Sequence, residues 1–311
     1  MNEHPVPFTT SIFRDRRRHV DRPALGIAFM LASGLVMSSA DGFLKWTAAT
    51  LPTGEIMAFR GVVSLALILA IVARTGQWSA LREIDPWGQF GRAAMIVMAT
   101  FLLIAAYRVM PLADAIALAF VSPILTAALA PWFLKERVGW RRWLAVVIGF
   151  GGAVVMLRPA GGFLLLALLP LGAAVCDTFR DIITRRLSSQ DSSLAIVFYT
   201  TLGVTVVGAG TLPFDYVPPE PVDYLYLAAI GVLLVSANFL MIEGFRHAEA
   251  SLISPFRYVV LVWAGLIGYV VFGDVPGLWT LGGGGVIVAS GLFISYRERV
   301  RTAERAATPS A

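Results

Sequence analysis

Charged residues inside long apolar stretches are the part of this sequence that could do chemistry. Arg60 lies in one such stretch and Arg257 in another. A charge at the centre of a bilayer costs about 2.5–3.5 kcal/mol on insertion scales, so both arginines are candidate ligand-binding residues. A structural pair with Glu55 is the alternative for Arg60. Pro255 frees a backbone carbonyl close to Arg257, and Pro255 and Pro123 are candidate bending points.

A second cluster is acidic. Asp177 and Asp181 stand one helical turn apart, and Arg180 can reach either of them. One aspartate paired with Arg180 forms a structural unit, whereas the other could bind and release a proton. Asp177 is therefore a candidate for proton coupling as well as for ligand binding, and Glu243 is a second candidate for the proton.

Asp41 and Lys45 are also one turn apart, so they can form a pair. Such a pair fits either a plain interfacial contact or part of a gate, and both residues remain candidates for a ligand pathway. Three further polar or aromatic candidates lie inside apolar stretches, namely Tyr199, Asn238 and Tyr258.

The composition shows which elements must position these residues. Charged residues make up 14% of the 311 residues, against about 25% in soluble domains. Cys176 is the only cysteine, and the three histidines are scattered, which predicts no disulfide framework and no metal site. The two lysines stand outside any phosphate-binding loop, so no cofactor is expected.

A bilayer core of about 30 Å requires about 20 apolar residues per helix. The sequence predicts an all-α integral membrane protein with ten transmembrane helices. The expected spans are 24–44, 54–73, 93–110, 113–134, 143–158, 162–181, 194–213, 223–245, 249–272 and 277–296.

Lys and Arg placement predicts the orientation, since cytoplasmic loops are enriched in both residues. With the N-terminus inside, 19 of the 25 Lys and Arg residues are cytoplasmic, 3 are outside and 3 fall within spans. The net charge of +5 then reflects orientation in the inner or plasma membrane, with both termini cytoplasmic, and not a nucleic-acid partner. The basic tail could contact membrane lipids.

The sequence partly repeats itself after about 136–139 residues. An odd number of spans per repeat would invert the second copy, which is a recurring design of secondary transporters. The expected division is a basic tail at 1–22, a first repeat at 23–159, a second repeat at 160–297 and a cytoplasmic tail at 298–311. The matching pairs are Asp41 with Asp177, Phe59 with Phe198, Tyr107-Arg108 with Phe245-Arg246, and Lys135-Glu136 with Gly273-Asp274.

The segment Pro111–Gly152 resembles the EamA family of the drug/metabolite transporter superfamily, with its small residues, mid-helix proline, F-L-x-E close and Trp-led helix. Within that family, three motifs are similar to riboflavin-type and S-adenosylmethionine-type uptake carriers. They are SSADGFLKW, CDTFRDIITRR and SPFRYVVLVWAGLIGYVVFGD. The resemblance implies two inverted five-helix EamA repeats and the uptake of a small ring-bearing solute, not an enzyme.

Alternative functions remain open. One is the export of amino acids or other metabolites. A remote one is an intramembrane aspartyl protease that uses Asp41 and Asp177. The Gly-x-Gly-Asp sequence of such proteases is missing here. A channel would need rings of like charge or a carbonyl filter, which single arginines do not provide. The glycine run 282–285 is explained by close helix packing or by a homodimer contact.

Overall fold

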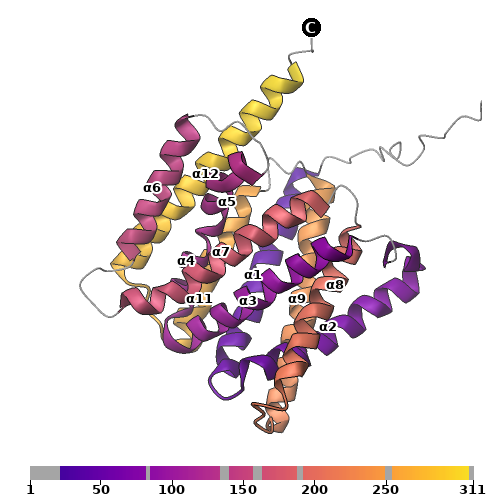
Figure 1. Ribbon diagram of the computed structural model, residues 1–311. Coiled ribbons are helices and arrows are strands. Elements are labelled where there is room, and N and C mark those ends of the chain that lie inside the picture. The colour runs from indigo at the N-terminus through magenta and orange to yellow at the C-terminus, as the bar shows by residue number, and fades with distance from the viewer. Residues whose placement is uncertain are drawn as a thin grey trace, which may run out of the picture.

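The computed structural model describes residues 22–81, 85–133, 140–156, 163–187, 192–248 and 254–307, and these residues are helical with no strand (Figure 1). The N-terminal half contains α1 (Pro23–Ala48), α2 (Thr53–Thr75), the 3₁₀ helix η1 (Trp78–Leu81), α3 (Pro86–Val109), α4 (Leu112–Ala119), α5 (Ser122–Phe133) and α6 (Trp140–Met156). The C-terminal half contains α7 (Phe163–Leu187), α8 (Ser193–Thr211), α9 (Pro221–His247), the 3₁₀ helix η2 (Ser254–Tyr258), α11 (Val259–Phe272) and α12 (Leu278–Ala307).

The ends of several helices follow from local residue chemistry. The Asp85 carboxylate accepts hydrogen bonds from two backbone N–H groups in the first turn of α3, and Glu220 and Asp223 form a capping box at the start of α9. Gly76 after α2 and Gly273 after α11 adopt positive φ values of 69° and 70°. Glycine reaches this left-handed conformation without a Cβ clash, so each residue ends its helix.

The predicted number of membrane spans is confirmed only in part. Eight helical segments of the described chain are long and apolar enough to cross a membrane, so the expected ten are not confirmed. α6 spans 17 residues in the described chain, and only the shorter segment Trp143–Met156 within it is apolar. α7 is long enough, but Asp177, Arg180 and Asp181 lower its apolar character.

Two of the predicted spans are not single regular helices. The expected span 113–134 is divided into α4 and α5, which separate around Phe120 and Val121, immediately before Pro123. The described part of the expected span 249–272 begins with η2, which contains Pro255 and leads into α11. The two irregular points therefore occur at corresponding positions of the two halves.

Helix packing interlocks the two halves of the chain. α1 packs against α9, and α3 packs against α7, so the first and third helices of one half contact the third and first helices of the other. α2 packs against α8, while α6 and α12 lie side by side at one edge of the bundle (Figure 1). Exchanging each helix for its counterpart in the other half reproduces these four contacts, so the main packing has twofold pseudo-symmetry.

Glycines allow the α6–α12 contact to be close. A Cβ added to Gly152 would lie 2.8 Å from the carbonyl oxygen of Gly283, which is inside any real contact distance. Gly283 belongs to the glycine run 282–285, whereas Gly282 and Gly285 face open space. The run therefore supports helix packing within one chain, as small residues do in membranes.

Candidate functional site

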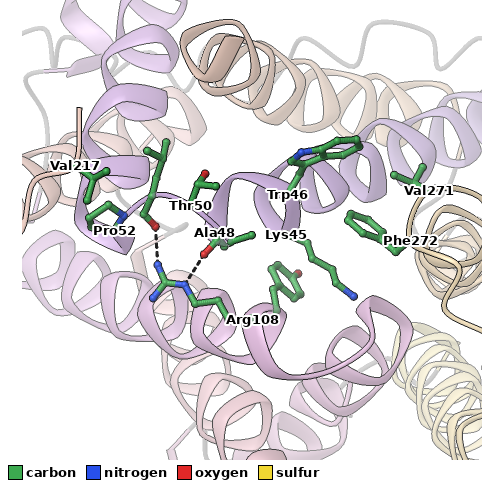
Figure 2. A pocket seen from close by; sticks show the side chains of 12 residues that line it. Lys45, Trp46, Ala48, Thr50, Pro52, Arg108, Val217, Val271 and Phe272 are labelled. Atoms are coloured by element: carbon green, nitrogen blue, oxygen red, sulfur yellow. Dashed lines mark hydrogen bonds between the residues drawn. The ribbon is translucent and has the colours of Figure 1, made fainter. Parts of the chain in front are cut away.

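A cavity of about 890 Å³ lies at one end of the helix bundle, where α1 ends, α2 begins, and α3 and α11 end (Figure 2). We call it the end cavity. Both halves of the chain contribute to it, and its volume falls within the range of about 300–1,000 Å³ typical of small-molecule sites. Its lining includes Lys45, Trp46, Thr50, Tyr107, Arg108, Val217 and Phe272.

One wall of the end cavity is aromatic. The Trp46 and Phe272 rings meet edge to face with centroids 6.2 Å apart, and Tyr226 lies behind Trp46 at 5.8 Å. The Trp46 side chain is 49% exposed, although it is a large apolar group. This wall offers a flat ring a stacking surface.

Lys45 joins the two halves of the chain at this cavity. Its Nζ lies 2.6 Å from the Asp274 carboxylate, which follows α11, and 4.7 Å from the centroid of the Phe272 ring. Asp274 also accepts a hydrogen bond from the backbone N–H of Leu112, at 3.4 Å. Lys45 therefore pairs across the interface between the halves, and not with Asp41 on its own helix.

Arg108 is held by backbone carbonyls and has little freedom to bind a ligand. Its guanidinium donates to the carbonyl oxygens of Ala48 and Leu51, both at 2.7 Å (Figure 2). A cation at the C-terminus of α1 compensates the unpaired carbonyls and the negative end of the helix dipole. Arg108 thus fixes the loop that forms the floor between α1 and α2.

Asp41, Arg60 and Tyr107 form a second feature, which we call the buried cluster. They come from α1, α2 and α3, and they are 7%, 8% and 2% exposed, respectively. Asp41 interacts electrostatically with Arg60, and the Tyr107 hydroxyl lies beside both charges. Tyr107 also lines the end cavity, so the cluster lies directly beneath the cavity.

Glu55 does not form the alternative pair with Arg60. One of its carboxylate oxygens accepts a hydrogen bond from the backbone N–H of Val217 at 3.2 Å, and the residue is fully buried. This contact ties the start of α2 to the loop between α8 and α9. The Arg60 guanidinium is thereby left to interact with Asp41.

Asp177 lies within electrostatic reach of Tyr107, but it has a direct partner of its own. Arg180 approaches Asp177 to 2.5 Å and Asp181 to 2.8 Å, all on α7. This is the structural unit that the one-turn spacing predicts, except that Arg180 bridges both aspartates. Asp41 and Arg60, two of the residues singled out by sequence, thus lie beside Tyr107, while Asp177 stays with Arg180.

The residues of the η2 segment lie in different environments. Arg257 is exposed, whereas Tyr258 is 9% exposed and packs against Phe120 with ring centroids 5.6 Å apart. Phe120 and Tyr258 therefore bring the irregular points of the two halves together. Pro123 and Pro255 lie within three residues of this ring contact.

The remaining candidates lie apart from the end cavity. Tyr199 donates a hydrogen bond to the Leu81 carbonyl in η1 at 2.9 Å, and Asn238 donates to the Leu234 carbonyl one turn earlier in α9 at 2.8 Å. Glu243 approaches His247 to 3.8 Å. Within the described ranges, no group of three or more His, Cys, Asp and Glu side chains could hold a metal ion.

Sequence reasoning missed Tyr107 and Asp274 as site residues. Both were already visible as matches between the repeats, since Tyr107 corresponds to Phe245 and Asp274 to Glu136. A hydroxyl present in only one repeat, and an acid that closes the corresponding span in both repeats, were the available signals. Only the fold shows that Tyr107 and Lys45 reach one cavity.

The sequence profile of the EamA-like transporter family matches residues 24–158 and again residues 164–296. The chain therefore belongs to the EamA-like transporter family of the drug/metabolite transporter superfamily, with the family's domain present twice.

Three similar proteins from bacteria cover nearly the whole chain. An S-adenosylmethionine uptake transporter of Rickettsia bellii is 27% identical over 89% of this chain and 95% of its own. A riboflavin transporter of Vibrio cholerae is 31% identical over 89% and 94%. The pseudopaline exporter CntI of Pseudomonas aeruginosa is 26% identical over 88% and 97%.

One solved crystal structure superposes on this chain with a TM-score of 0.63 at 17% identity, covering 87% of this chain and 96% of the other. At that identity the likeness concerns the fold alone. It supports an architecture shared over almost the full length of both chains.

Proposed function

We propose that this protein is a secondary carrier that imports a small ring-bearing, cofactor-type solute, similar to riboflavin or S-adenosylmethionine. The observation that carries the proposal is the end cavity between the two halves, with its aromatic wall, its inter-repeat ion pair and the buried cluster beneath it. Relatives named for S-adenosylmethionine uptake and for riboflavin support the same cargo class. The protein is a carrier, not an enzyme.

The proposed topology has ten membrane-crossing segments in two inverted repeats, 23–159 and 160–297, with both termini cytoplasmic. The twofold pseudo-symmetry of the helix contacts supports the repeats. The placement of 19 of the 25 Lys and Arg residues supports the orientation in an inner or plasma membrane. In this orientation the end cavity faces outside, which favours uptake.

Transport proceeds by rocking of the halves around a site at their interface. The Lys45–Asp274 pair joins α1 to the end of α11, so it breaks or rearranges when the outer side opens and closes. The Phe120–Tyr258 contact lies where the helices are interrupted, and Pro123 and Pro255 let these segments bend. No hinge is then required within the continuous helices.

In this mechanism Asp41, Arg60 and Lys45 contact the cargo as it leaves the end cavity. Arg257, Tyr258, Tyr199 and Asn238 line later parts of the path. Asp177 is the first candidate for proton coupling and Glu243 the second, because each is an acidic side chain within an apolar helix.

Uptake into proteoliposomes tests the proposal. Radiolabelled riboflavin and S-adenosylmethionine are offered separately, and at least one is expected to enter with saturable, competitor-sensitive kinetics. Empty liposomes serve as the control. Absence of saturable uptake of every ring-bearing solute tested would refute the proposal.

Export of a metabolite is the second candidate function, supported by similarity to the pseudopaline exporter. Inside-out vesicles separate the two directions, since an exporter accumulates cargo in them against its gradient. An intramembrane protease fits less well, because Asp177 pairs with Arg180 at 2.5 Å and Asp41 interacts with Arg60, so each aspartate is next to an arginine and not part of a carboxyl dyad.

A further inference from the structure

Asp41 and Arg60 carry opposite buried charges that do not touch. Their residues are 7% and 8% exposed, and they attract each other electrostatically. Yet within the part of the chain that the structure describes, neither side chain makes a direct ion pair. The Tyr107 hydroxyl beside them is buried and meets no acceptor in hydrogen-bonding geometry among the same residues.

Buried charges are normally paired and hydrogen-bonded, because removal from water is costly. The other ionic groups nearby already have direct partners. Lys45 is bound to Asp274, Arg108 to backbone carbonyls, and Arg180 to Asp177 and Asp181. Asp41 and Arg60 are thus two buried charges of this region that make no direct ion pair among the described residues. Glu55 also keeps one carboxylate oxygen without a partner there, but its other oxygen is held at the start of α2 by the backbone N–H of Val217.

We infer that the buried cluster binds the zwitterionic head group of an α-amino acid, with Arg60 receiving its carboxylate, Asp41 its ammonium group, and Tyr107 donating a hydrogen bond to the carboxylate. This inference rests on the proposed carrier function and narrows its cargo. Guanidinium–carboxylate recognition is bidentate and specific. A zwitterion supplies both missing partners without changing the net charge of the site.

The position of the cluster matches a cargo with a ring as well as a head group. Asp41 lies one turn before Lys45 on the same face of α1, a rise of about 6 Å along the helix, and the Lys45 Nζ lies 4.7 Å from the Phe272 ring of the aromatic wall. A ring stacked on the aromatic wall and a head group at the cluster are therefore separated by a short linker. S-adenosylated amino acids have this layout, whereas riboflavin has neither an ammonium group nor a carboxylate.

The first test needs no mutation. The purified full-length protein is melted in detergent with S-adenosylmethionine, S-adenosylhomocysteine or 5′-methylthioadenosine. The third compound keeps the adenosine and the sulfur but lacks the amino-acid head, and the second lacks the sulfonium charge. We expect both amino-acid compounds to raise the melting temperature at concentrations where 5′-methylthioadenosine does not. An equal shift with 5′-methylthioadenosine would overturn the inference.

The second test changes the cluster. Because Asp41→Asn alone leaves Arg60 buried without compensation and could unfold the protein, the double variant Asp41→Asn/Arg60→Gln removes both charges together. We expect its apparent affinity for S-adenosylmethionine to fall at least tenfold, and Tyr107→Phe to weaken it several-fold. Arg74 lies at the exposed far end of α2, the helix that carries Arg60. The Arg74→Gln variant should therefore bind S-adenosylmethionine like the wild type. A folded double variant with unchanged affinity contradicts the assignment.

These outcomes separate the inference from the proposed function. Saturable riboflavin uptake that persists in the double variant would overturn the zwitterion site and leave the carrier proposal intact. Binding of ring-free amino acids through Asp41 and Arg60, without uptake of any ring-bearing solute, would retain the head-group site and refute the proposed cargo class.

Discussion

The two halves of the protein place similar residues at corresponding positions but connect them differently. Asp41 on α1 corresponds to Asp177 on α7. Asp177 is held at 2.5 Å by Arg180 of its own helix, whereas Asp41 faces Arg60 and Tyr107 from two other helices. The second half thus satisfies its charge locally, and the first half leaves its charges available for a ligand.

The same contrast holds one turn further along these helices. Lys45 corresponds to Asp181, and Lys45 reaches across to Asp274 at 2.6 Å, while Asp181 stays with Arg180 at 2.8 Å. One half therefore holds the contact between the repeats that must change during transport. The comparison shows that pseudo-symmetry of helix packing does not imply symmetry of function.

Replacing Asp41 and Asp177 in two separate variants should give the largest difference in cargo exchange between the two halves. In a counterflow assay, which requires binding but no driving gradient, Asp41→Asn should lower cargo exchange roughly 30-fold or more, the size expected from about 2–5 kcal/mol for a broken buried charge interaction. Asp177→Asn should retain exchange, because Arg180 keeps Asp181. Equal losses in the two variants, measured per folded molecule, would remove the distinction between the halves.

Charge reversal at the inter-repeat pair should have the next largest effect. Lys45→Asp places two acids together beside the end cavity, and uptake is expected to fall about tenfold because like charges repel in a partly dry site. The double swap Lys45→Asp/Asp274→Lys should recover most of the lost rate. If the swap is no better than the single reversal, the pair is not the relevant contact.

The glycine contact between α6 and α12 should affect stability and not cargo affinity. Gly283→Ala introduces a Cβ against the Gly152 carbonyl and Met156, and overpacking of this kind costs about 1–3 kcal/mol. Gly282→Ala makes the same change towards open space and should melt like the wild type. Indistinguishable melting temperatures for the two variants would contradict the packing described for this helix pair.

The smallest effect is expected at two tyrosines. Tyr199→Phe removes a hydrogen bond to the Leu81 carbonyl and should cost about 0.5–1.5 kcal/mol in stability, with a smaller loss of cargo affinity than Tyr107→Phe because Tyr199 lies apart from the end cavity. Tyr107→Phe removes a hydroxyl that lies beside Asp41 but makes no hydrogen bond of regular geometry among the described residues, so stability should fall less than for Tyr199→Phe while affinity falls more. If melting and binding measurements instead show that Tyr107→Phe mainly lowers stability and Tyr199→Phe mainly lowers cargo affinity, the roles assigned to the two tyrosines are wrong.

Part of this site could be predicted from the sequence. Arg60, Asp41 and Asp177 stand out because charges within apolar segments are costly, and the fold places Asp41 and Arg60 beside Tyr107. Their pairings could not be predicted, since helical spacing favours Asp41 with Lys45 and nearness in the sequence suggests Glu55 with Arg60. Packing of the helices replaces both pairs with contacts from distant segments.

The sequence by itself determined a helical membrane protein with a repeated domain of the EamA-like transporter family. Its low charge, its apolar segments and its internal matches are local properties that persist in any arrangement of the helices. The tertiary structure decided which helices are interrupted, which charges are paired and where the end cavity lies. These features depend on distances between segments such as α1 and α11, which lie far apart in the sequence and meet only when the two halves interlock.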